Sequence, residues 1–242
     1  MRKALIAFGI FILCLPLFFS LWLLAAVQSP KLDHITQQTP SGLRQFVASA
    51  VMGNAGFGKK SLPAVERALR LDPDNAEALD RKCSLESSDN TPASLEDCQK
   101  SLRIKPTAEA YYNVGNAQLE QGNVCDAETN LTEAASKSSS SGNAWYLNRM
   151  GVAAIRCNDL PGARAALEAA LDQDNKSLNA PNQEQDDLDE DHENILSDQE
   201  LLVIVYQDQH EKGLEAATCK AAHPDKPHCN CAIGKDNNPT CT

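Results

Sequence analysis

Apolar side chains recur along most of the chain with the spacing of short amphipathic helices that come in pairs. In residues 108–137, the sequence AEAYYNVGNAQLEQGNVCDAETNLTEAASK contains two such stretches, separated by Gly122 and Asn123. Apolar or small residues three and four positions apart mark one face of each stretch as helical. A helical hairpin of this size cannot bury its apolar face alone, and the pattern therefore predicts a stack of hairpins.

The stretch 108–141 resembles a tetratricopeptide repeat, a helix–turn–helix unit of about 34 residues. The residues at the spacing of that family are Tyr111, Val114, Gly115, Gly122, Ala127, Leu131 and Ala134. The same spacing recurs over 144–177, and more weakly over 42–75 and 76–107. The resemblance implies an all-α fold in which the repeats stack into a right-handed solenoid with a concave side. A generic bundle of helical hairpins is the alternative.

An uncharged run, residues 4–27, follows Arg2 and Lys3. A helix of about 20 apolar residues is long enough to cross the hydrocarbon core of a bilayer, and the basic pair predicts a cytoplasmic N-terminus. We expect residues 1–30 to form a transmembrane signal anchor, which places the rest of the chain in the periplasm or another extracytoplasmic space. A cleaved secretory signal is the alternative, although the run is long for one and lacks a good cleavage site.

The segment that follows the repeats is acidic. Residues 176–200 contain nine Asp or Glu against one Lys, which favours a solvated linker. Asp187, Asp189 and Asp191 alternate as in a calcium loop, but His192 stands where an EF-hand loop requires glycine. The apolar residues that come next predict two helices, about 197–210 and 212–222, that cover the end of the solenoid. A β-strand over 201–206 is the alternative.

These patterns divide the chain into an ordered set of segments. They are the anchor 1–30, a linker 31–41, the repeat region 42–177 (with repeats 42–75, 76–107, 108–141 and 144–177), an acidic linker 178–196, capping helices 197–222 and a cysteine-rich C-terminal tail 223–242.

Eight cysteines follow the anchor, and an even number in an exported chain predicts disulfides. Repeat positions that face each other pair Cys83 with Cys98 and Cys125 with Cys157. The pairing of the remaining four, Cys219, Cys229, Cys231 and Cys241, is not fixed by the sequence. A zinc or copper site is an alternative for the tail, with Cys219, His223, His228, Cys229 and Cys231 as ligands, and a redox-active pair is another. The spacing matches no regular zinc finger, and a C-x-x-C motif is absent.

The net charge of −11 argues against nucleic acid as a partner. The sequence contains no nucleophile motif, phosphate loop or H-E-x-x-H motif, and we expect neither an enzyme nor a bound cofactor or metal. The repeat resemblance implies that a peptide or partner protein binds along the concave side. The residues expected to contact it are Arg81, Tyr112, Asn113, Asn116, Asn148, Arg149 and Arg156. Arginine and asparagine side chains suit carboxylates and peptide backbone.

Together these features favour a membrane-anchored scaffold or adaptor for the assembly of envelope complexes or for protein export. The carboxylate-clamp type of repeat is only partly matched, because Asp80, Tyr112 and Asn148 replace its lysine. The rival hypothesis is a thiol-redox or metal-handling envelope protein that uses the cysteine-rich tail. In a secreted eukaryotic protein, Asn130 and Asn175 would begin glycosylation sequons.

Overall fold

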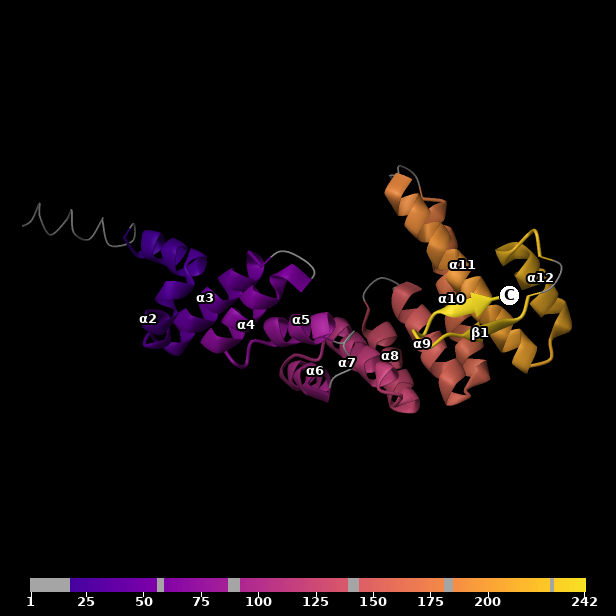
Figure 1. The fold of residues 1–242 in the computed structure, drawn as a ribbon, viewed down its shortest axis with the longest axis horizontal. Helices are drawn as coiled ribbons and strands as arrows, with labels where there is room; N and C mark the ends of the chain where they lie inside the picture. The colour runs from indigo at the N-terminus through magenta and orange to yellow at the C-terminus, as the bar shows by residue number, and fades with distance from the viewer. Residues whose placement is uncertain (1–17, 56–58, 87–91, 139–143, 181–184, 227–228) are drawn as a thin grey trace, which may run out of the picture. The chain divides into compact units, whose positions relative to one another are not determined.

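The computed structural model describes residues 18–55, 59–86, 92–138, 144–180, 185–226 and 229–242. The chain forms two compact units, Met1–Leu85 and Glu86–Thr242. Each unit has its own apolar core, made almost entirely by helices (Figure 1).

The first unit consists of short helices. After a helix over residues 18–28, its elements are η1 (Pro30–Leu32), α2 (Asp33–Gln37), α3 (Ser41–Gly53), η2 (Lys59–Ser61), α4 (Leu62–Leu71) and α5 (Ala76–Glu86). Pro63 fits the first turn of α4, where its missing N–H is not needed. The core consists of Val47, Ala48, Val51 and Met52 of α3 packed against Val65, Ala68 and Leu71 of α4.

A buried arginine holds the end of the helix over residues 18–28. Arg67 of α4 is only 6% exposed, and its guanidinium donates to the carbonyls of Ala26, Val27 and Ser29. Its Nε also lies 2.8 Å from Asp33 Oδ1. The last carbonyls of a helix have no partner within the helix, and Arg67 supplies one for this end.

The predicted anchor, residues 1–30, lies largely outside the described residues. Within the part of the chain that the structure describes, no helix is both long and apolar enough to cross a membrane. The described remainder of the uncharged run carries exposed apolar side chains, namely Phe18, Phe19, Leu21 and Leu24.

The second unit contains longer helices and a small hairpin. Its elements are α6 (Pro92–Ile104), α7 (Ala108–Glu120), α8 (Val124–Lys137), α9 (Ala144–Cys157), α10 (Leu160–Leu178), α11 (Gln185–Asp208), α12 (Lys212–Ala222), β1 (Cys231–Ile233) and β2 (Pro239–Cys241). From α6 to α12, each helix packs on the next along the chain. The two strands are antiparallel, with Cys231 opposite Cys241.

Side chains in the turns set where two of these helices begin. The hydroxyl of Thr107 accepts a hydrogen bond from the Ala110 N–H at the start of α7. The carboxylate of Asp159 accepts one from the Gly162 N–H at the start of α10. Both residues satisfy an amide that the helix leaves without a partner.

Two glycines allow close contact between the helices of a hairpin. A Cβ atom on Gly115 of α7 would lie 2.6 Å from Leu131 Cγ of α8, and one on Gly151 of α9 would lie 2.6 Å from Leu167 Cγ of α10. Both leucines are fully buried. Gly115, one of the residues at the repeat spacing, therefore lies where α7 and α8 approach closely, and Gly151 makes the same contact between α9 and α10.

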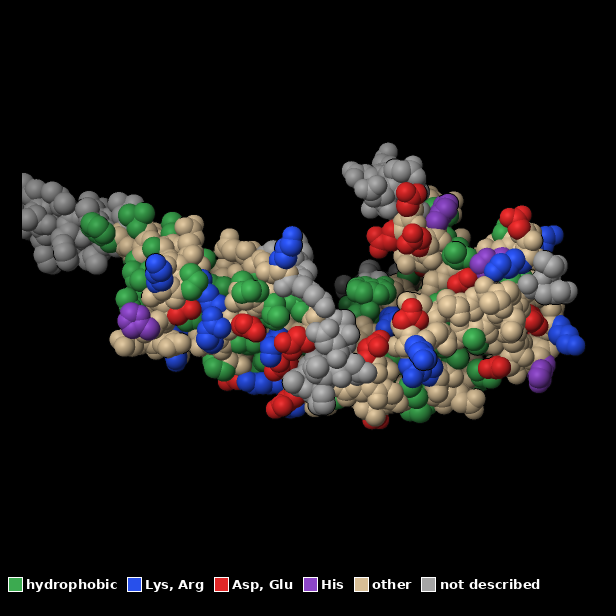
Figure 2. All heavy atoms as spheres, in the orientation of Figure 1, with side chains coloured by type: hydrophobic (Ala, Val, Ile, Leu, Met, Phe, Trp, Pro, Cys, Tyr) green, Lys and Arg blue, Asp and Glu red, His purple; other side chains and the backbone are tan. Residues whose placement is uncertain are grey.

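The acidic segment differs from its prediction. Residues 185–196 belong to α11 and are helical rather than part of a linker over 178–196. Acidic side chains gather on the first half of this helix (Figure 2), yet Asp191 and Asp198 are buried. Contacts with α9 and α10 outweigh the preference of a charged sequence for solvent. These contacts cannot be deduced from the amino-acid composition of the segment.

The predicted capping helices and the alternative strand are also corrected. The first helix does not begin at 197 but continues from Gln185 to Asp208, while the second spans Lys212–Ala222. The strand over 201–206 is wrong, because these residues are helical and all six are buried. They are enclosed by α9, α10, α12 and the hairpin, which explains an apolar run without helical periodicity.

Candidate partner-binding surface

Three aromatic rings from α7 and α9 form a cluster. Tyr112 lies with its ring centroid 4.7 Å from that of Trp145 and 5.0 Å from that of Tyr146. Tyr112 is only 6% exposed, whereas Trp145 is 58% exposed. The side chain available to a partner is therefore Trp145, which sequence reasoning did not select, and Tyr112 lies beneath it.

A polar network continues from this cluster along α7 and α9. Arg149 donates from Nε to Asn116 Oδ1 at 3.0 Å, and its Nη2 lies 3.5 Å from Glu120 Oε1. Glu120 Oε1 also accepts a hydrogen bond at 2.8 Å from Asn237 Nδ2. Arg156 completes the network by donating to Asn237 Oδ1.

Asn237 comes from the loop between β1 and β2, so the chain covers part of its own predicted groove. Its side chain is nearly fully buried, and its backbone has φ of 63°, a conformation that asparagine tolerates better than most residues. Lys226 Nζ donates to the Cys241 carbonyl, and Gln207 Nε2 donates to that of Cys229. These bonds hold the hairpin on the helices.

The sequence analysis did not predict that the β1–β2 hairpin packs on the helices. The signal available was Gly234 and Asn237-Asn238 between two cysteines, a composition typical of hairpin turns. That signal predicts a turn but does not identify the helices on which the turn packs.

Beside the covered part, a cavity of about 190 Å³ remains open. It is lined by Ala144, Trp145, Asn148, Arg149, Asp174, Asn194, Ser197 and Asn238. Asn148 Nδ2 donates to Asp198 Oδ1 at 2.7 Å. The cavity thus brings one aromatic side chain together with several hydrogen-bonding groups from α9, α10, α11 and the hairpin loop.

Two buried carboxyl groups lie against each other at this cavity. Burial raises the pKa of Asp198 to about 8, an effect that the hydrogen bond from Asn148 reduces and the neighbouring Asp174 increases. Burial also raises the pKa of Asp174 to about 6, with Asp191 adding to the increase. The two carboxyl groups also form a hydrogen bond with each other. The pair therefore retains a proton at neutral pH.

The predicted contact residues do not all lie together. Asn116, Asn148, Arg149 and Arg156 lie on α7 and α9, around the aromatic cluster and the cavity or at the hairpin loop. Asn113 is buried. Arg81 belongs to α5 of the first unit.

Disulfides join two of the described cysteines in the repeats and four others in α12 and the tail. Cys125 is bonded to Cys157, the pair that the repeat spacing predicted, with Cα atoms 5.0 Å apart. Cys219 of α12 is bonded to Cys229 of the tail, and Cys231 is bonded to Cys241. Cys83 and Cys98 are disulfide-bonded and fully buried, and their pairing with each other stays a prediction.

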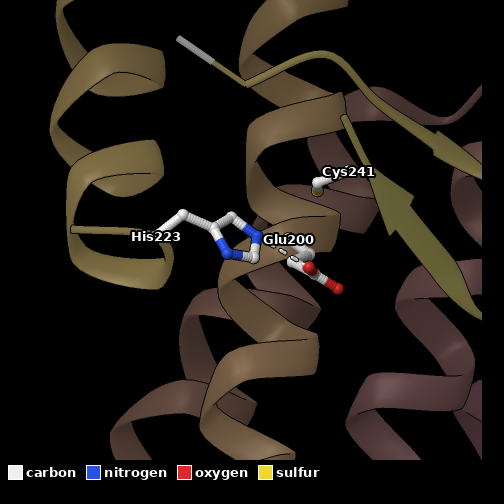
Figure 3. A group of neighbouring side chains, drawn as sticks. All are labelled: Glu200, His223 and Cys241. Atoms are coloured by element: carbon white, nitrogen blue, oxygen red, sulfur yellow. Dashed lines mark hydrogen bonds and ion pairs between the residues drawn. The ribbon is translucent and has the colours of Figure 1, made fainter. Parts of the chain in front are cut away.

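One group of possible metal ligands lies between α11 and the hairpin. Ligand atoms of Glu200, His223 and Cys241 are within 4.8 Å of one another, and His223 Nε2 is 2.8 Å from Glu200 Oε1 (Figure 3). Cysteine binds metal as a thiolate, but the sulfur of Cys241 is bonded to Cys231. The His223–Glu200 contact therefore links the end of α12 to α11 instead.

No protein-family model and no curated protein matches the sequence. Among solved structures, a MamA fragment (residue 41 to the end) from Desulfovibrio magneticus RS-1 is 14% identical, with 76% of this chain and 93% of that chain covered and a TM-score of 0.56. YrrB, described as a TPR protein with an unusual peptide-binding site, is 13% identical, with 81% and 91% covered and a TM-score of 0.54. Identities this low establish the fold alone, and the chain has a tetratricopeptide-repeat fold.

Proposed function

We propose that this protein is a membrane-anchored adaptor that binds an extended peptide or a partner protein outside the cytoplasm. The binding surface consists of Trp145, Asn148 and Arg149 on α9 and the cavity beside them. The observation that carries the proposal is the exposed Trp145 at the rim of a polar cavity. YrrB, described as a TPR protein with an unusual peptide-binding site, has a similar fold, which supports this use of the fold.

The composition of the surface suits a peptide. Tryptophan is enriched among the residues that contribute most to binding at protein interfaces, and Trp145 is 58% exposed. Amide side chains donate and accept hydrogen bonds, and so match the alternating groups of a peptide backbone. Asn148, Asn194 and Asn238 supply such amides around the cavity.

The disulfides support an extracytoplasmic location. The eight cysteines from Cys83 to Cys241 are all disulfide-bonded, and structural disulfides persist in oxidising compartments. An adaptor in such a compartment would bring partners together during assembly of an envelope complex or during protein export.

The helix over residues 18–28 supports the anchor. Phe18, Phe19, Leu21 and Leu24 are between 51% and 71% exposed, although water is an unfavourable environment for such side chains. They continue the uncharged run of residues 4–17, and lipid would cover them if the run is inserted in a bilayer.

The test is photo-crosslinking in the native cell with benzoylphenylalanine in place of Trp145. A matched control carries the same group in place of Glu133, an exposed residue of α8. We expect a discrete adduct from position 145 and none from position 133, with mass spectrometry naming the partner. No adduct at 145, or the same mixture from both positions, contradicts the proposed surface.

A further inference from the structure

We propose that the cavity between α9, α10, α11 and the hairpin loop binds a lysine side chain of the partner. This inference rests on the proposed function and specifies the chemistry that the partner presents. It begins from the size of the cavity, about 190 Å³. That is smaller than the roughly 300–1,000 Å³ of small-molecule sites and is the space of about six water molecules at about 30 Å³ each. One long side chain fits such a volume.

The charge on the cavity wall favours a cation. Asp174 lines the cavity and is 6% exposed, while Asp198 behind it is fully buried. The two carboxyl groups share one proton through their mutual hydrogen bond, so one negative charge remains on the pair at neutral pH, and a buried charge is costly unless it is paired. Arg149 lines the same cavity, but its guanidinium is held by Asn116 and Glu120. A cationic group from outside would pair with the negative charge that remains on Asp174 and Asp198.

The surface around the cavity extends this charge. Asn194 and Ser197 line the cavity on α11, and exposed Glu190 and Glu193 precede them on the same helix. The first half of α11 carries a group of acidic side chains (Figure 2). A partner segment with a lysine in the cavity would therefore find further negative charge along α11, which favours its approach.

The arrangement of acceptors suits an ammonium group better than a guanidinium. The carboxyl of Asp174, the hydroxyl of Ser197 and the amide oxygen of Asn148 come from three different helices. An ammonium carries three donors around one nitrogen, whereas a guanidinium presents its donors in a plane. The exposed ring of Trp145 at the rim provides an apolar and electron-rich surface for the methylene stem and the charge.

The experiment uses the fluorescence of Trp145 in the full-length chain. The sequence has two tryptophans, and Trp22→Phe leaves Trp145 as the reporter. The protein is titrated with acetyl-Ala-Lys-Ala-amide and, separately, with the same peptide carrying norleucine, which has a similar chain without the charge. We expect the dissociation constant to be at least about ten-fold lower for the lysine peptide, the factor that about 1.4 kcal/mol produces.

A variant tests whether the preference for the lysine peptide arises at the cavity. Asp174→Asn keeps the shape of the side chain and removes its charge, and we expect it to equalise the two dissociation constants. Asp172→Asn is the matched control, because Asp172 lies on the same helix with its side chain 63% exposed. It should keep the full preference. Thermal melting by circular dichroism verifies that both variants are folded.

Equal affinity for the two peptides in the unmodified cavity overturns the inference without any variant. A lysine preference that survives Asp174→Asn overturns it as well. The proposed function fails separately, through the absence of a cross-linked partner at position 145. A discrete cross-linked partner together with equal peptide affinities would leave the adaptor standing and remove the lysine site.

Discussion

Arg156 of α9 donates a hydrogen bond to the side-chain oxygen of Asn237, a residue 81 positions later in the chain. Asn237 in turn donates to Glu120 of α7 at 2.8 Å. One asparagine therefore connects the ends of two repeat helices to the loop of the C-terminal hairpin. The arrangement makes the hairpin part of the repeat structure and not a separate tail.

Removal of this asparagine side chain is expected to destabilise the protein. Asn237→Gly retains the positive φ of 63°, since glycine adopts it freely, and removes the two hydrogen bonds. We expect the free energy of unfolding in urea to fall by about 1–3 kcal/mol, because each of the two lost hydrogen bonds is made with a charged side chain, Arg156 or Glu120. Asn238→Ala, at an exposed neighbouring position, should change it by less than about 0.5 kcal/mol. An unchanged midpoint for Asn237→Gly would contradict the docking described above.

An alanine at Gly115 is expected to force the helices of one hairpin apart. Its Cβ atom would lie 2.6 Å from Leu131 Cγ, and overpacking of this kind costs about 1–3 kcal/mol. Gly213→Ala is the control, since a Cβ at that helical position meets nothing within 4 Å. The control should stabilise the protein, by up to about 1 kcal/mol, through helix propensity. Thermal and urea unfolding of both variants measure the difference, and similar values for the two would show that the hairpin adapts to the extra methyl group.

The buried carboxyl pair predicts that stability falls as the pH rises. The pKa of Asp198 is raised to about 8 and that of Asp174 to about 6, so the folded state binds more protons than the unfolded state above the ordinary carboxyl pKa of about 4. The contribution of these groups to stability is therefore present at low pH and is lost between about pH 4 and pH 8. Comparing melting temperatures at several pH values for the unmodified protein and Asp198→Asn isolates this contribution.

Asp198→Asn keeps an acceptor for Asn148 and cannot ionise, so its melting temperature should fall less over that pH range. Asp172→Asn, at an exposed position on α10, should follow the unmodified protein. Parallel pH profiles for all three proteins would mean that the carboxyl pair does not hold the proton.

The disulfide between Cys125 and Cys157 is expected to stabilise the two hairpins that it joins. The cysteines are 32 residues apart in sequence, and closing a loop of that length typically contributes about 2–4 kcal/mol. Replacing both by serine should lower the free energy of unfolding by this amount. Peptide mapping without reduction should recover the 125–157 fragment from the unmodified protein. Free thiols at these positions would refute both the pairing and the oxidising compartment.

Arg67 is expected to hold the end of the helix over residues 18–28. Its guanidinium reaches three carbonyls and Asp33, a set that a lysine ammonium cannot reproduce because it lacks the planar fork. Arg67→Lys should therefore increase amide hydrogen exchange at the residues that follow this helix. Arg70→Lys, at an exposed position of α4, should leave exchange unchanged. Equal exchange in both variants would show that the carbonyls are held by other groups.

Local patterns predicted much of the repeat fold. Gly115 and Leu131 stand at the spacing that brings two helices into close contact, and the structure contains that contact. Cys125 and Cys157 occupy positions that the stacking of adjacent hairpins brings together. Such relationships depend on residues a few turns apart and on a regular repeat, which explains why the sequence was sufficient for them.

Features that depend on distant contacts were not predictable in the same way. Asp198 belongs to a charged stretch, yet it is buried by helices that the stretch does not encode. Tyr112 stands at a position facing the groove, but Trp145 from the following hairpin covers it. Asn237 packs on α7 and α9 across many intervening residues. In each case the burial or contact of the residue depends on another segment of the chain, and the position of that segment is known only from the folded structure.

The docked hairpin also has a consequence for the order of events during biosynthesis. A ribosome makes α7 and α9 well before the residues that complete their polar network. Until Asn237 arrives, Glu120 and Arg156 lack the hydrogen bonds that its side chain makes. The growing chain therefore passes through an interval in which this part of the groove is not yet covered. Chaperones that bind the growing chain would meet that uncovered form, and partners of the complete chain would meet the covered one.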